Sequence, residues 1–179
     1  MNAVKWIAGD NKSNTGEYVI AWWQRIGKYV SGLMSEYWLQ NPNDLTDLRG
    51  YGAAWDDNWT NYQSLVSVAQ SLGADFMGEM EAYAPGDARI ARYGRASFLL
   101  DWNGAGGCFF YAVRSDTYDG KTTNSTVDIG RPTGAKVQAN ASVWKRQYAS
   151  GVVYVNPSQT QQSVDGYTLA PEDALIVAN

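Results

Sequence analysis

The stretch Val30-Ser31-Gly32-Leu33-Met34-Ser35-Glu36-Tyr37-Trp38-Leu39 decides the fold that the sequence predicts. It is typical of a short buried strand over residues 30–39, because strand side chains alternate between two faces. One face is apolar or glycine until its last position, which is a carboxylate; this face carries Val30, Gly32, Met34 and Glu36. Ligand chemistry in α/β sheets lies beyond the carboxyl ends of strands, so Glu36 is a candidate site residue. The alternative is a solvated glutamate beside two aromatic residues that pack in the core.

Composition and charge bound the class of protein. The chain has 179 residues, enough for one domain with a core, and its 45% hydrophobic and 18% charged content is that of a globular protein. The net charge is −4 and no basic run occurs, which argues against a nucleic-acid partner. No apolar run approaches the length that spans a bilayer, so we expect no membrane partner.

The absence of histidine restricts the chemistry. With no histidine in the chain, Ser-His-Asp catalysis, Cys-His catalysis and histidine-based metal binding are excluded, and we expect neither a metal nor a cofactor. Acid–base work must fall to carboxylates, tyrosine or lysine. Cys108 is the single cysteine, so no internal disulfide can form, and its apolar surroundings in the sequence predict a buried structural thiol.

Residues 1–116 read as an α/β region with the order β-β-α-β-α-β. Residues 18–23 are apolar and rich in β-branched and aromatic side chains, so we expect a strand, joined to the strand over 30–39 irregularly or as a hairpin. Apolar periodicity and stop signals then predict two helices and two further strands; the helices cover 59–72 and 87–102, and the strands 74–80 and 108–113.

Residues 117–179 have a different character. Turn residues are frequent up to Asn140, and three antiparallel strands are expected after it, over 143–148, 152–155 and 174–177. The sequence therefore predicts a small antiparallel β region that packs on the α/β region.

Five stretches carry a resemblance to a known family; they are residues 32–38 (GLMSEYW), 93–100 (YGRASFLL), 128–132 (DIGRP), 144–157 (WKRQYASGVVYVNP) and 169–176 (LAPEDALI). In this order they resemble the C-terminal half of a (β/α)8 glycoside-hydrolase barrel. The group that they resemble most is glycoside-hydrolase-like family 15, with the polygalactosaminidase-like barrels as relatives. The resemblance implies a partial, half TIM-type barrel whose strands 5 to 8 are the four expected strands, followed by the β tail.

The resemblance also implies a site. Glu36 would be the general acid at the end of strand 6, whereas the family's other acid would lie on strand 4, which has no counterpart here. A complete barrel needs about 250 residues. Glycosidases use two carboxylates, and Glu79, at the end of the neighbouring expected strand, is the best candidate for the second. The alternative for Glu79 and Glu81 is a solvated loop pair.

Aromatic residues are numerous, with 8 Trp and 12 Tyr. Their flat faces and polar handles suit stacking on sugar rings, although interfaces and secreted folds use them too. If the chain is part of a sugar-cleaving enzyme, the candidate substrate-binding residues that would stack on the sugar are Trp22, Trp23, Tyr37, Trp38 and Trp55.

These observations leave the enzymatic activity open between two functions. The first is part of a carbohydrate-active barrel that acts on a polysaccharide. The second is a non-catalytic carbohydrate-binding or structural protein, such as a component of an extracellular coat, filament or virion; a generic interaction domain would explain the aromatic residues but not the ordered tail. A half barrel leaves two open strand edges, so we expect a homo-oligomer or a partner chain or domain that supplies the other half; the alternative is that the tail covers the sheet. An extracellular or cell-surface location fits these functions, although no signal peptide is visible.

Overall fold

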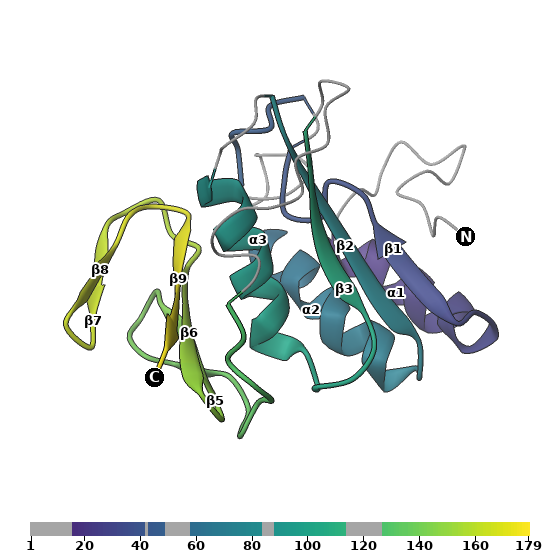
Figure 1. Ribbon diagram of the computed structural model, residues 1–179. Coiled ribbons are helices and arrows are strands. Elements are labelled where there is room, and N and C mark those ends of the chain that lie inside the picture. The colour runs from purple at the N-terminus through teal and green to yellow at the C-terminus, as the bar shows by residue number, and fades with distance from the viewer. Residues whose placement is uncertain (1–15, 42, 49–57, 84–87, 114–126) are drawn as a thin grey trace.

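The computed structural model describes residues 16–41, 43–48, 58–83, 88–113 and 127–179, and the structural statements below refer to these residues. They form a mixed α/β fold with one three-stranded parallel sheet, one four-stranded antiparallel sheet and a β-hairpin (Figure 1). The predicted combination of a parallel α/β region and an antiparallel C-terminal region is confirmed, and no closed barrel forms among the described residues. The division at residue 116 lies outside them and stays a prediction.

The strand predicted over residues 18–23 is wrong, because this segment belongs to helix α1 (Gly16–Ile26). The buried side chains Val19 and Trp23 are four residues apart, and the partly buried Trp22 and Ile26 complete one helical face. A 3-10 turn, η1 (Gly27–Tyr29), then leads into the first strand. The order of elements is therefore α-β-α-β-α-β, and neither the expected hairpin nor a fourth parallel strand is present in the described part of the chain.

The parallel sheet has the order β1-β2-β3, with strands β1 (Gly32–Ser35), β2 (Asp75–Ala82) and β3 (Cys108–Val113). Strand β1 is shorter than the predicted 30–39, because the chain turns over residues 36–39 and Tyr37 has a φ of 51°. Helix α2 (Asn58–Ser71) joins β1 to β2 and helix α3 (Ala88–Asp101) joins β2 to β3, close to the predicted bounds. All three α-helices lie on one face of this sheet (Figure 1).

Alternating burial identifies the face that packs on the helices. In β1 and β2 every second residue is buried, and this covered face carries Leu33, Ser35, Phe76, Gly78, Met80 and Ala82. Residues between them are partly exposed and form the other face, called the open face below; its members are Gly32, Met34, Met77, Glu79 and Glu81. In β3, Cys108 is opposite Met77 and Phe110 is opposite Glu79, which places both on the open face. The prediction that Cys108 is buried is wrong, since its side chain is exposed at the start of β3.

The C-terminal region packs on the other side of α3 (Figure 1). Its sheet has the order β4-β5-β6-β9, formed by β4 (Val137–Gln138), β5 (Trp144–Tyr148), β6 (Gly151–Asn156) and β9 (Asp173–Ala178). A hairpin, β7 (Gln162–Val164) with β8 (Tyr167–Leu169), covers its outer face. Strand β6 is buried throughout, because Val153 and Val155 join the main core while Val152 and Tyr154 face the hairpin. The three antiparallel strands predicted from the sequence correspond to β5, β6 and β9.

Arg146 of β5 fastens this sheet to the end of α3. Its Nη1 donates to the carbonyls of Leu99 (3.0 Å), Leu100 (2.9 Å) and Trp102 (2.7 Å). Carbonyls in the last turn of a helix have no partner within the helix, and the dipole there favours a cation. The ion pairs Arg92–Asp173 (2.5 Å) and Lys136–Asp101 (2.8 Å) add to the same interface. Helix α3 is thus packed between the parallel sheet and the antiparallel sheet.

No helix in the described ranges has the length and apolar character needed to cross a membrane.

Candidate functional site

The carboxyl edge of the parallel sheet brings Glu36 and Glu79 together. Ser35 is opposite Gly78 in the parallel register, so the next residues along, Glu36 and Glu79, are neighbours. The backbone N–H of Trp38 donates to the carbonyl of Glu79 at 2.8 Å, which ties the turn after β1 to β2. Glu81 follows two residues later on the same face of β2. The two candidate catalytic residues are therefore adjacent, as expected for consecutive strands of a parallel sheet.

The carboxyl group of Glu79 binds its proton more tightly than an ordinary glutamate does. Burial, then the negative charge of Glu81 and then that of Glu36, raise its pKa from 4.5 to about 6. Each cause disfavours the charged form of a carboxyl group. Near neutral pH, Glu79 can therefore hold a proton in a fraction of molecules and release it easily, which is the property required of a general acid.

Trp23 and Trp38, two of the predicted stacking residues, are fully buried. Both rings pack against Phe76, at centroid distances of 6.0 and 5.0 Å respectively, on the covered face. The Trp38 Nε1–H donates to the carbonyl of Tyr62 in α2 at 2.5 Å. Neither ring has a surface left to meet a sugar, because both belong to the core beneath the helices.

The other predicted stacking residues lie in different surroundings. Tyr37 is half-buried in the turn beside Glu36, so it remains close to the candidate acids. Trp22 is partly buried in α1 and packs on the core. Trp55 lies outside the described residues.

Tyr83 is a candidate that the sequence analysis missed. It follows β2 directly, 53% of its surface is exposed, and its hydroxyl accepts a long hydrogen bond from the N–H of Leu45 at 3.5 Å. A two-residue repeat would have identified it, since Glu79, Glu81 and Tyr83 alternate with the buried residues of β2. Tyr83 offers an exposed aromatic ring at the carboxyl edge, where the buried tryptophans do not.

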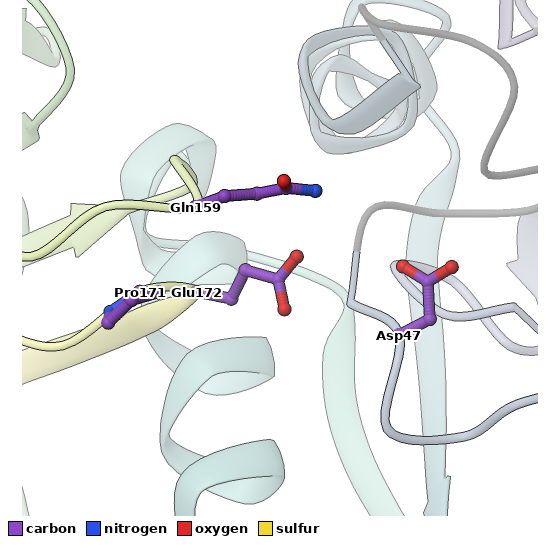
Figure 2. Close-up of a pocket in the computed structure, with 4 residues that line it drawn as sticks. All are labelled: Asp47, Gln159, Pro171 and Glu172. Atoms are coloured by element: carbon purple, nitrogen blue, oxygen red, sulfur yellow. The ribbon is translucent and has the colours of Figure 1, made fainter.

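A separate hollow lies between the loop over 43–48 and the C-terminal region (Figure 2). It has a volume of about 230 Å³ and is lined by Asp47, Gln159, Pro171 and Glu172. Figure 2 shows the carboxylates of Asp47 and Glu172 facing one another across it. Arg89 supports both walls, because its Nη2 donates to the carbonyl of Thr46 (3.4 Å) and its Nη1 lies 3.8 Å from Glu172 Oε2. Neither Glu36 nor Glu79 lines this hollow.

The described residues contain no group of three or more His, Cys, Asp or Glu side chains with a geometry that could hold a metal ion. Cys108, at the other end of the open face, is exposed, but partial desolvation of its thiol and the charge of Asp75 raise its pKa, so its thiolate is disfavoured. The chemistry available at the carboxyl edge is thus that of carboxyl groups. No family model and no curated protein matches the chain.

Proposed function

We propose that this chain is part of a carbohydrate-active, glycoside-hydrolase-like barrel that acts on a polysaccharide at the carboxyl edge of its parallel sheet. In this proposal β1, β2 and β3 are three consecutive barrel strands, the open face points to the barrel interior, and the antiparallel sheet is the tail that follows the barrel. Support comes from the helices, which cover one face only, and from the acids. Glu36 comes directly after β1 and Glu79 lies in the C-terminal half of β2, towards the edge where barrel enzymes carry their chemistry.

The observation that carries the proposal is the coupling between Glu36 and Glu79. Neighbouring strands lie about 4.8 Å apart, so carboxyl groups at the ends of adjacent strands can approach the separation of roughly 5 Å that retaining glycosidases use. The charge of Glu36 contributes to the pKa of about 6 at Glu79. We therefore assign the general acid to Glu79, whereas the sequence favoured Glu36, and give Glu36 the role of the second carboxylate.

Stacking surfaces for the sugar would come from Tyr83 and Tyr37, which remain accessible near the acids. Three strands do not enclose a site, so further strands would be supplied by a second copy or by a partner chain. A polysaccharide substrate would fit an extracellular or cell-surface location.

A hydrolysis assay tests the proposal. The purified chain is incubated with a panel of polysaccharides, and new reducing ends are counted. Glu79→Gln should lower the rate at least about 100-fold, because loss of a general acid typically costs that much or more. Asp75→Asn is the matched control, since Asp75 begins the same strand at the opposite edge of the sheet; its rate should stay that of the wild type.

Binding without cleavage distinguishes the alternative function. If the wild-type chain retains a glycan in affinity electrophoresis but produces no reducing ends, the non-catalytic carbohydrate-binding role replaces the enzymatic one. If it neither binds nor cleaves any member of the panel, both carbohydrate functions are abandoned for this chain.

A further inference from the structure

Gln40 is a fully buried polar residue directly behind the candidate acids. Its side-chain Nε2 donates to the carbonyl of Glu81 at 2.7 Å, and its Oε1 accepts from the N–H of Glu81 at 2.6 Å. The same Nε2 donates to the carbonyl of Leu45 at 2.7 Å. One amide group therefore connects the turn after β1, the end of β2 and the loop over 43–48.

The two hydrogen bonds between the Gln40 side chain and the backbone of Glu81 replace bonds that a longer β1 would make to β2. In β2, the backbone of Glu79 and Glu81 points towards β1, and Trp38 N–H satisfies the carbonyl of Glu79. The main chain after β1 has by then turned away, and the side chain of Gln40 bonds the next pair of backbone groups, those of Glu81. The Gln40 amide presents its Oε1 and one Nε2–H to the same side, and so supplies the acceptor and the donor that two peptide groups of a longer β1 would present.

We propose that Gln40 is a positioning residue that holds the Glu79–Glu81 segment in place at the carboxyl edge of the sheet. Its amide bonds the backbone of Glu81 and not the Glu81 carboxylate. Its second bond, to Leu45, holds the loop over 43–48 against the same strand end, where Leu45 also meets the hydroxyl of Tyr83. These hydrogen bonds allow the chain to leave the sheet after Ser35, while Glu81 and Ala82, the last two residues of β2, remain in strand conformation.

The catalytic meaning of this role rests on the proposed function, but the role itself does not. Glu79 owes its high pKa to burial and to the charges of Glu81 on β2 and Glu36 after β1, so it reports on the position of the strand end. If the Gln40 bonds are lost, this segment relaxes towards solvent, and both the burial and the repulsion decrease.

The test is a carbon-13 NMR titration of the glutamate side-chain carboxyl groups in the full chain, with Glu79→Gln used to assign the Glu79 signal. In Gln40→Leu, which keeps the bulk and removes the hydrogen bonds, the pKa of Glu79 should fall from about 6 towards 4.5. Gln40→Met is the second variant, in case Gln40→Leu does not fold. Its flexible side chain adapts to the buried site but has no amide group, so the pKa of Glu79 should fall in this variant as well.

Gln63 supplies the matched control. It is also fully buried, and its Nε2 donates to the carbonyl of Ser97 at 3.0 Å, between α2 and α3. Gln63→Leu should destabilise the protein without moving the pKa of Glu79. The proposal is overturned if a folded Gln40 variant keeps the wild-type titration, or if Gln63→Leu shifts it equally. A chain that cleaves no polysaccharide but shows the Gln40-specific shift would refute the enzymatic function alone.

Discussion

The two faces of the parallel sheet are made by alternating residues of the same three strands, yet they differ in burial and in charge. The covered face presents Leu33, Phe76 and Met80, which are completely buried beneath the helices. The open face presents partly exposed side chains, and its carboxyl end carries Glu36 and Glu79. Because side chains alternate along a strand, a residue on the covered face stabilises the fold, whereas the next residue lies on the open face that carries the acids.

This difference shows how a small sheet can hold an acid with a raised pKa. Keeping Glu79 partly desolvated beside two other carboxylates costs stability, because the charged form is disfavoured. The aromatic cluster on the opposite face, where Phe76 lies between Trp38 and Phe98 at centroid distances of 5.0 and 6.1 Å, supplies compensating burial. The comparison predicts that equal substitutions on the two faces have unequal effects.

The largest effect is expected for phenylalanine removal. Phe76→Ala on the covered face should lower the free energy of unfolding by about 3–5 kcal/mol, because it leaves a cavity in the core. Phe110→Ala on the open face should cost only about 1 kcal/mol, since that ring is already partly exposed. Urea denaturation of both variants measures the difference. Equal losses would mean that the open face is covered in solution, by a second copy or by another part of the chain, and the comparison would fail.

A smaller effect is expected where a single methyl group is added. Gly78 lies on the covered face, and a Cβ there would be 2.7 Å from Phe76 Cε1 and 2.8 Å from Trp38 Cε3. Gly78→Ala should therefore cost about 1–3 kcal/mol through overpacking. Gly32 is the open-face counterpart, where a Cβ would be 3.3 Å from the flexible end of Met77, 3.5 Å from the carbonyl oxygen of Asp75 and 3.9 Å from Asp75 Cβ. Gly32→Ala should stay within about 0.5 kcal/mol of the wild type in the same assay.

Elements with a complete periodic pattern and a clear stop were predictable from the sequence. The helix expected over 59–72 is α2, and its stop at Gly73 coincides with a φ of 72° that suits glycine. Helix α1 was missed because residues 18–23 alone have the composition of a strand. Its helical repeat becomes visible only when the window reaches Ile26, which is packed with Val19 against the core.

The candidate site was predictable in one respect and not in another. Consecutive parallel strands bring their ends together, so the proximity of Glu36 and Glu79 follows from the order of elements. The direction of Trp38 does not follow, because the positive φ of Tyr37 ends the strand alternation and turns the indole under Gly78. The role of Gln40 depends on the same turn, and no local pattern in the sequence marks a glutamine that bonds a backbone 41 residues away.

The smallest expected effect is the pH dependence of stability that the proton on Glu79 produces. It arises on the open face and not on the covered face. The pKa of Glu79 is about 6 in the folded chain and near 4.5 in the unfolded chain, so the folded state binds this proton more tightly. The contribution of the Glu79 proton to stability is fully present below pH 4.5 and is lost as the pH rises through 6.

The loss of stability should be less than about 1 kcal/mol, because solvent screens a partly exposed carboxyl group. Glu79→Gln should remove this decline in urea titrations between pH 4 and 8, whereas Gly32→Ala, at the opposite end of the open face, should keep it. Glu81→Gln should bring the upper end of the decline closer to pH 4.5, since the charge of Glu81 is the second cause of the raised pKa. An unchanged decline in Glu79→Gln would show that another group of the chain produces it, and the open face would then lose its assigned proton.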